Sequence, residues 1–179
     1  PWRPDVEIAQ ADVSDLDQIR GALEGVDVAY YLIHSLGTGH TFEARDRQAA
    51  LNFGQAAREA GVGRIVYLGG LYPEHEELSP HLRSRKEVGD ILLASGVPTT
   101  VLQAAVILGS GSASFEMMRY LTERLPAMIA PKWIDNRIQP ILIIDVLRYL
   151  VLAAEMPPEV SRAFDIGGPD VLTYREMMQ

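Results

Sequence analysis

Residues 25–34 read Gly-Val-Asp-Val-Ala-Tyr-Tyr-Leu-Ile-His, and this stretch decides the fold class. The run from Val26 to Ile33 is almost continuously apolar, which is typical of a strand buried on both faces of a sheet. Gly25 closes an amphipathic helical pattern that comes directly before it. A helix followed at once by a doubly buried strand indicates an α/β domain with a parallel sheet.

The same alternation of strand and helix patterns continues on both sides of this stretch. On the N-terminal side, a short strand over 6–9 leads to Asp12, and Ser14 is expected to cap the next helix. On the C-terminal side the expected elements are helices over 42–60, 79–95, 112–125 and 145–155, strands over 64–68, 99–108, 128–131, 139–144 and 164–166, and a last helix opened by Thr173. Repeated βαβ units of this kind predict a doubly wound sheet with helices on both faces.

Polar and glycine residues stand where the predicted strands end. Ligands of open α/β sheets bind at the carboxyl ends of the strands, so these positions are the first candidates for a site. The candidate segments are Asp12, 32–35 (LIHS), 68–70 (LGG) and 103–105 (QAA).

Composition narrows the class of protein further. The 179 residues carry a net charge of −8, which argues against a nucleic-acid partner because such proteins usually present a basic face. The absence of cysteine excludes disulfides and thiolate metal sites, and the histidine spacing suggests no metal site. The most apolar run, 138–154, is interrupted by Pro140, Asp145 and Arg148, so no membrane span is expected. A cytoplasmic bacterial protein is the simplest reading.

Several strand-end segments resemble the short-chain dehydrogenase/reductase superfamily, and most closely its atypical branch of NmrA-like and epimerase-like NAD(P)-binding proteins. The order and spacing of the matches carry the resemblance, which covers nearly the whole chain. The matching segments are 10–15 (QADVSD), 25–34, the helix with Asp46 and Asn52 that ends in 56–62 (AAREAGV), and 173–176 (TYRE).

The resemblance implies NAD or NADP as the cofactor and assigns residues to it. The Asp12 side chain would meet the adenine amino group, and the backbone amide of Val13 would contact the ring. The strand-end residues expected to line the cofactor are Leu32, Ile33, His34, Leu68, Gly69 and Gly70.

The family's first β-α-β unit, with its G-x-x-G-x-x-G turn, should precede Val6 and is not in the sequence. Those glycines let backbone amides approach the pyrophosphate. We therefore expect a fragment of a longer protein, with weak or no dinucleotide binding by this chain alone. Residues 109–114 (GSGSAS) follow a late strand and are a weak substitute for that turn.

The family's catalytic residues are changed in this chain. The catalytic serine falls on Gly69 or Gly70, where no hydroxyl exists. Aligning Ser84-Arg85 with the family's Ser-Lys places His81 at the tyrosine position and Arg85 at the lysine position. His81 would then be the proton donor and Arg85 would hold the ribose. A slip of one residue would give Leu82 and Lys86, and loss of the catalytic role is the other reading.

The region after the sixth strand of the family is its substrate side. Gln103, Gly109, Ser110 and Trp133 are expected there. The chain is accordingly predicted to be one partial Rossmann-like domain over 1–179, with a nucleotide-binding core over 1–110 and a small α/β substrate-side lobe over 111–179.

The sequence thus predicts an NAD(P)-binding oxidoreductase or an enzyme similar to nucleoside-diphosphate-sugar epimerases. Its partners would be a dinucleotide and a small-molecule substrate, with homo-oligomerisation left open. The alternatives are a non-catalytic dinucleotide sensor or scaffold and an interaction module of a larger protein.

Overall fold

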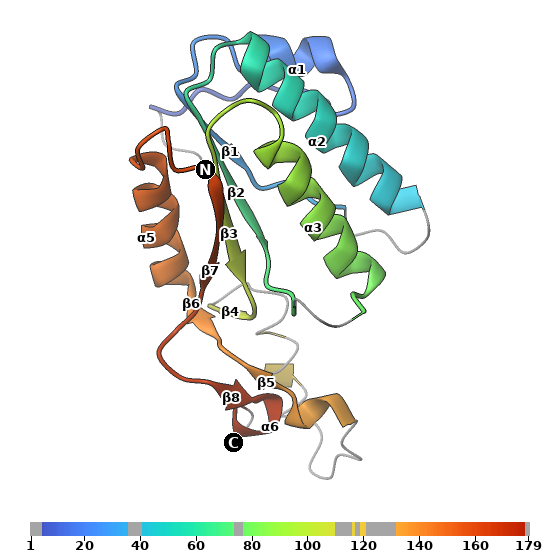
Figure 1. Ribbon diagram of the computed structural model, residues 1–179, viewed down its shortest axis with the longest axis vertical. Coiled ribbons are helices and arrows are strands. Elements are labelled where there is room, and N and C mark those ends of the chain that lie inside the picture. Colours follow the sequence, from blue (N-terminus) through green and yellow to red (C-terminus); the bar gives the residue numbers. More distant parts are fainter. Residues whose placement is uncertain are drawn as a thin grey trace.

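The computed structural model describes residues 5–35, 41–73, 77–109, 116, 119–120 and 132–177. Their centre is a four-stranded parallel sheet in the order β1-β2-β3-β7 (Figure 1). The strands are β1 (Val28–Tyr31), β2 (Arg64–Gly70), β3 (Thr99–Ala104) and β7 (Arg162–Ile166). All run in one direction, so their carboxyl ends meet at one edge of the sheet.

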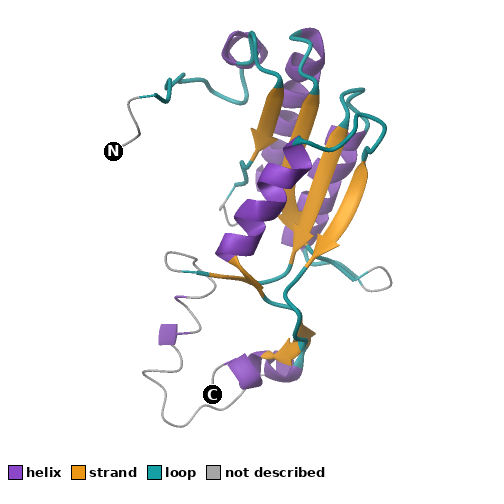
Figure 2. Ribbon diagram, turned by 90° about the vertical axis from the view of Figure 1, so that its left-hand side faces the viewer, coloured by secondary structure: helices purple, strands orange, loops and turns teal. Residues whose placement is uncertain are grey.

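Helices cover both faces of this sheet, as Figures 1 and 2 show. One face carries α1 (Leu16–Ala22), α2 (Thr41–Glu59) and α3 (Pro80–Leu93), and the other carries α5 (Ile143–Ala154). The predicted doubly wound Rossmann-like α/β fold is therefore confirmed.

The core between the sheet and α2 and α3 is built around three aromatic rings. Tyr31 of β1 meets the Phe53 and Tyr67 rings edge-on, with centroids 4.9 and 5.9 Å away. Ala50 and Ala56 on α2 are completely buried, and their small side chains let the helix lie close to the strands. This packing positions the ends of β1 and β2 against α2 and α3.

The core on the other face is smaller and aliphatic. Val66 and Leu102 from the sheet pack with Val146 and Leu150 of α5. The apolar run over 138–154 is thus a short strand followed by a core helix, as the sequence predicted.

The C-terminal part lies beyond the carboxyl edge of the main sheet (Figure 2). Two short pairings build it: β4 (Ile107–Leu108) with β6 (Ile141–Leu142), and β5 (Arg137–Ile138) with β8 (Leu172–Thr173). The 3-10 turn η1 (Lys132–Asp135) and α6 (Tyr174–Met177) complete it. The boundary at residue 110 between a core and a substrate-side lobe stays a prediction.

Three local predictions were wrong. Residues 6–9 are not a strand, because no described strand lies beside them to pair with, and Val6 and Ile8 are exposed. Asp15 rather than Ser14 caps α1, since its carboxylate accepts the amides of Asp17 and Gln18. Asp145 does not cap α5, which begins two residues earlier at Ile143.

Two helical glycines give opposite predictions for stability. In Gly89→Ala the new methyl group would meet Val101 Cγ1 at 3.5 Å, an ordinary contact. Because glycine inside a helix costs up to about 1 kcal/mol relative to alanine, this change should raise the free energy of unfolding by about 0.5–1 kcal/mol. In Gly54→Ala the methyl group would lie 2.9 Å from Ser95 Cβ.

Overpacking of that kind should outweigh the gain in helix propensity, so Gly54→Ala should lower the free energy of unfolding by about 1 kcal/mol. Urea unfolding of both variants measures the difference. Equal effects of the two changes would contradict the close approach of α2 to the end of α3.

Candidate functional site

The carboxyl edge of the sheet holds a cavity of about 460 Å³ beside the end of β1. Its volume falls within the range of about 300–1,000 Å³ that is usual for small-molecule sites. Three of the residues predicted to bind the cofactor line it, namely Asp12, Val13 and Ile33, and the other lining residues are Ser14, Ser35, Ala44, Arg45, Asp46, Gln48 and Ala49.

Asp12 is placed by a tight turn in the segment before α1. Its Oδ1 accepts the backbone N–H of Ser14 at 2.8 Å and the Ser14 hydroxyl at 2.7 Å. These hydrogen bonds stabilise the carboxylate and hold the pKa of Asp12 below its ordinary value. Asp12 therefore adds a negative charge to the lining of the cavity.

Asn52 of α2 anchors the segment that carries Asp12. Its Nδ2 donates to the carbonyl oxygens of Val13 and Ser14 at 3.1 and 3.0 Å, and Gln48 donates to its Oδ1. The sequence resemblance included Asn52 as part of a helix and gave it no role. The sequence signal for this role is weak, because a single asparagine in a long helix does not reveal which loop its side chain anchors.

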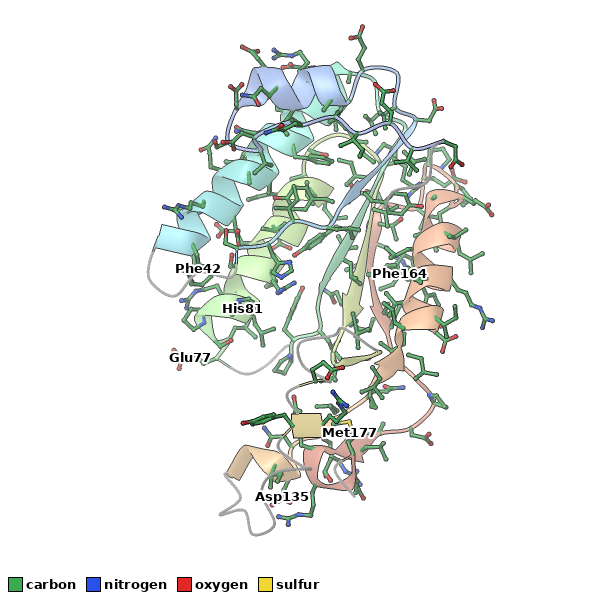
Figure 3. The ribbon with its side chains drawn as sticks, turned by 180° about the vertical axis from the view of Figure 1, so that it is seen from behind. Phe42, Glu77, His81, Asp135, Phe164 and Met177 are labelled. Atoms are coloured by element: carbon green, nitrogen blue, oxygen red, sulfur yellow. The ribbon has the colours of Figure 1, made fainter. Side chains whose placement is uncertain are left out.

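His81 and Arg85 lie one helical turn apart at the start of α3. The Nε–H of Arg85 donates to Nε2 of His81 at 3.1 Å, so the imidazole is neutral and its remaining proton is on Nδ1. Figure 3 shows His81 near Phe42, and the two ring centroids are 6.3 Å apart. The predicted pair is thus together in space.

His34, three residues after the end of β1, faces the same pair. Partial burial, followed by the positive charge of Arg85, holds the pKa of both His34 and His81 below the ordinary value of 6.5. The charge of Asp46 acts in the opposite direction on both imidazoles. At pH 7 the two histidines are therefore neutral, and they lie at this edge of the sheet together with the guanidinium of Arg85.

These shifts predict how stability depends on pH. A histidine with a depressed pKa in the folded state binds its proton more readily when unfolded, so acid favours unfolding. The free energy of unfolding should therefore fall as the pH drops from about 6.5 through the lower pKa values of folded His34 and His81. Urea midpoints measured from about pH 7.5 to about pH 5.5 test this.

The double variant His34→Gln, His81→Gln is the matched control, because neither amide titrates. Its unfolding free energy should change less over that interval. A slope equal to that of the unaltered protein would show that other groups cause the dependence.

The three residues at the end of β2 divide between the two faces. Leu68 packs against the aliphatic core on the α5 side. A methyl group on Gly70 would lie 3.3 Å from both Arg85 Cδ and Leu82 Cδ2, and one on Gly69 would lie 3.0 Å from the Tyr67 ring. Because α3 packs so closely on Gly70, a serine there would have to push Arg85 or Leu82 aside.

The alternative register points to Lys86, which lies elsewhere on α3. Its ammonium pairs with Asp90 at 2.6 Å and stands 5.8 Å from the centroid of the Tyr72 ring. Leu82 packs on Gly70 and carries no polar group. Arg85 and Leu82 both reach Gly70 at the end of β2, but only the pair His81 and Arg85 is joined by a hydrogen bond.

The predicted substrate-side residues are not gathered into one described site. Gln103 of β3 is buried and donates to the hydroxyl of Tyr72 at 2.9 Å. Gly109 faces α5, where a methyl group would lie 2.6 Å from Ile143 Cγ2. Ser110 and the side chain of Trp133 lie outside the described residues, as do 128–131 and most of 112–125.

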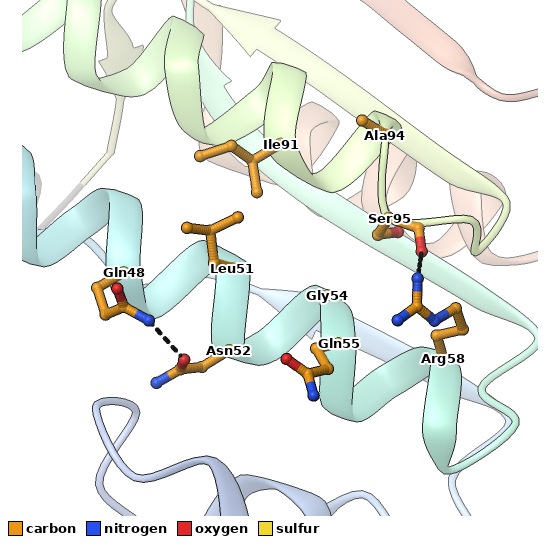
Figure 4. Close-up of a pocket in the computed structure, with 9 residues that line it drawn as sticks. All are labelled: Gln48, Leu51, Asn52, Gly54, Gln55, Arg58, Ile91, Ala94 and Ser95. Atoms are coloured by element: carbon orange, nitrogen blue, oxygen red, sulfur yellow. Dashed lines mark hydrogen bonds between the residues drawn. The ribbon is translucent and has the colours of Figure 1, made fainter.

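Two further cavities lie away from the predicted residues. One of about 470 Å³ lies between α2 and α3, lined by residues such as Leu51, Gly54 and Ile91 (Figure 4). The other, of about 480 Å³, lies between α5 and β7 and is largely apolar. Within the described segments no three histidine or acidic side chains gather to hold a metal ion, and none of the helices is long and apolar enough to cross a membrane.

A doubly wound parallel sheet with a cavity at its carboxyl edge defines a Rossmann-type nucleotide-binding domain. A family model described as NAD(P)H-binding matches residues 1–122, and the chain belongs to this NAD(P)H-binding family. The predicted resemblance to NAD(P)-binding proteins is thus confirmed, and so is NAD or NADP as the cofactor of this type of domain. Membership of the narrower NmrA-like branch stays a prediction.

Curated relatives are similar over different parts of the chain. Subunit 9 of the mouse mitochondrial NADH dehydrogenase [ubiquinone] 1 alpha subcomplex is 26% identical over 162 residues, which are 89% of this chain and 43% of that protein. The 3 beta-hydroxysteroid dehydrogenase/Delta 5→4-isomerase of Mycobacterium tuberculosis is 32% identical over 77 residues, 37% of this chain and 21% of that protein. The chain thus spans less than half the length of these relatives.

Solved structures share the fold. WbmG of Bordetella bronchiseptica, in complex with NAD and UDP, has a TM-score of 0.79 at 17% identity, covering 99% of this chain and 63% of that one. MoeE5 in complex with UDP-glucuronic acid and NAD has a TM-score of 0.76 at 20% identity, covering 91% and 64%. UDP-N-acetylglucosamine 4-epimerase from Bacillus cereus has a TM-score of 0.73 at 19% identity, covering 94% and 68%.

Proposed function

We propose that this chain forms the adenosine side and the proton-transfer side of an NAD(P) site in an oxidoreductase or a sugar-nucleotide epimerase-like enzyme. The observation that carries the proposal is the cavity of about 460 Å³ beside the end of β1. It brings together Asp12, Val13 and Ile33 from segments about 20 residues apart, and His34, which stands between the lining residues Ile33 and Ser35, faces the His81–Arg85 pair.

The residues around this cavity suit an adenosine group. Ile33, Ala44 and Ala49 offer apolar surface for a flat ring, and Asp12 offers an acceptor for an exocyclic amino group. Arg85 donates only one of its N–H groups to His81 among the described residues, so its other donors can hold ribose hydroxyls. These residues therefore fit part of a dinucleotide.

The bound nicotinamide would supply or accept a hydride, and His81 would handle the proton. His81 carries its proton on Nδ1 while Nε2 accepts from Arg85. As a neutral imidazole it can donate a hydrogen bond from Nδ1 to a substrate carbonyl oxygen. Full transfer of that proton requires Nε2 to take up another, so Arg85 must first release Nε2.

A titration with NADH, NADPH and AMP, followed by cofactor fluorescence and by NMR, tests the binding part of the proposal. AMP should bind at the Asp12 cavity, because AMP requires only the adenosine side. Incubation with NAD and a panel of UDP-sugars, with and without His81→Ala, tests the chemistry. Failure of every nucleotide to bind would refute the proposal, and turnover that is unchanged in His81→Ala would refute the role of His81.

A second candidate is a nucleotide-binding subunit or sensor without catalytic turnover. Two observations favour it: glycines occupy the end of β2, where the resemblance places a catalytic serine, and the mouse relative similar over 89% of this chain is named as a subunit of a larger enzyme. Nucleotide binding without turnover of any tested substrate would support this candidate over the enzyme.

A further inference from the structure

Asp46 of α2 is a buried acid that touches two other elements of the site. Its side chain is 8% exposed. One carboxylate oxygen, Oδ1, accepts the backbone N–H of Ser35 at 3.0 Å, and Oδ2 accepts the hydroxyl of the buried Ser84 at 3.1 Å. Asp46 therefore connects the segment after β1 to the first turns of α3.

Each of these contacts stands next to a group of the candidate site. Ser35 follows His34, and Ser84 lies beside Arg85 and one helical turn after His81. Ser35 and Asp46 also line the cavity that contains Asp12. The carboxylate of Asp46 thus lines the nucleotide cavity and also supports the part of α3 that carries the His81–Arg85 pair.

The hydrogen bonds alone do not require a charged residue at this position. An asparagine could accept the Ser35 amide with its Oδ1 and donate to the Ser84 hydroxyl with its Nδ2. A buried carboxylate costs more free energy than a buried amide, so the charge needs another explanation. The titratable groups that sense this charge are Tyr31 of β1, Tyr67 of β2, His34 after β1 and His81 of α3.

We infer that Asp46 is a positioning residue, whose carboxylate ties the segment of His34 to the first turns of α3 beside the nucleotide cavity and whose charge offsets that of Arg85 at the two imidazoles. This inference rests on the proposed function of His81 as the group that handles the proton. Arg85 and partial burial disfavour a positive charge on the two imidazoles, and the carboxylate of Asp46 opposes that effect. Asp46 thereby keeps the pKa of His81 closer to neutral pH, where a group exchanges protons most readily.

The decisive variant is Asp46→Asn, which removes the charge and retains both hydrogen bonds. We expect the NMR titration midpoints of His34 and His81 to move to lower pH, because the opposing negative charge is lost. The matched control is Glu43→Gln on the same helix. Glu43 pairs with Arg83 of α3 at 3.2 Å, so this control also removes a charge between α2 and α3, and it should leave both histidine midpoints unchanged.

A second variant tests the geometry even if Asp46→Asn does not fold. Ser84→Ala keeps the carboxylate and removes its contact with α3. The His81 midpoint should then fall while that of His34 changes little, because the bond to Ser35 remains. Unchanged midpoints in Asp46→Asn, or in Ser84→Ala if only that variant folds, would overturn the inference.

NADH and AMP titrations of the same variants separate this inference from the proposed function. If the unaltered protein binds no nucleotide, the proposed function fails, whereas the histidine midpoints still decide the role of Asp46. If nucleotides bind and the midpoints do not respond to Asp46→Asn, only the positioning role is refuted.

Discussion

Replacing Arg64 by alanine should lower the free energy of unfolding by about 3–4 kcal/mol, the largest effect that we expect from a single substitution in this protein. Arg64 opens β2 and is 3% exposed, so its guanidinium is buried. It donates to the Thr100 hydroxyl at 2.8 Å and to the carbonyl oxygens of Val160 and Pro157 at 3.0 and 2.6 Å. The alanine variant would remove the guanidinium donor from all three acceptors, of which, among the described residues, only the Pro157 oxygen keeps another donor in the backbone N–H of Val160, and it would open a cavity.

The position of these acceptors explains why the loss should be global. Thr100 belongs to β3, and Pro157 and Val160 lie in the segment that joins α5 to β7. Arg64 thus connects β2 to β3 and to the segment before β7, at the edge of the sheet opposite the site. Arg64→Ala should therefore weaken the whole sheet, and urea unfolding measures the loss.

Arg58→Ala is the control for this prediction. Arg58 is exposed and makes one long hydrogen bond, 3.5 Å, to the carbonyl of Ser95. Its loss should cost less than about 0.5 kcal/mol, as is usual at the surface. Similar unfolding midpoints for the two alanine variants would contradict the role of Arg64.

Replacing Ala44 by tryptophan should weaken AMP binding by at least about 100-fold, which corresponds to about 2.7 kcal/mol. Ala44 is exposed on α2 and lines the cavity that contains Asp12. An indole at this position would occupy space that the adenosine group needs. Because Ala44 is exposed, the fold should tolerate the change, and the unfolding midpoint should stay nearly constant. Isothermal titration with AMP measures the effect.

Ala94→Trp is the matched control for the location of the site. Ala94 is also exposed, and it lines the cavity between α2 and α3 that Figure 4 shows. The two variants carry the same added side chain next to cavities of similar volume. If Ala94→Trp abolishes AMP binding and Ala44→Trp does not, the nucleotide site lies between the helices rather than at the carboxyl edge of the sheet.

Much of the fold could be predicted from local patterns. The run 26–33 was predicted to be a strand buried on both faces, but β1 covers only Val28–Tyr31 and leaves Tyr30 41% exposed. The strand β2 around Tyr67 is buried on both faces as expected, and glycines with positive φ, such as Gly61 (75°) and Gly96 (88°), end the helices where the sequence places them. Such patterns depend on neighbours in the chain, so a single sequence reveals them. Residues 6–9 have the composition of a strand, yet pairing depends on a neighbour that local composition cannot supply.

The candidate site was predicted only in part, for the same reason. His81 and Arg85 stand in the first turns of α3, and Asp12 stands shortly before α1, where a motif can point to them. Asp46 and Asn52 lie within the long helix α2, and their roles depend on Ser35, Ser84 and Val13, which are far away in the chain.

The sequence by itself determined that this protein has a doubly wound α/β fold and that its candidate functional residues lie near the ends of the predicted strands. It could do so because the spacing of apolar residues and the positions of glycines are local properties of the chain. Only the tertiary structure decided which polar side chains meet there. It showed that Arg85 bonds to His81, that α3 packs onto Gly70, and that Asp46 joins α2 to both sides of the site. These contacts form between residues up to about 40 positions apart, and packing of the helices against the sheet brings them together.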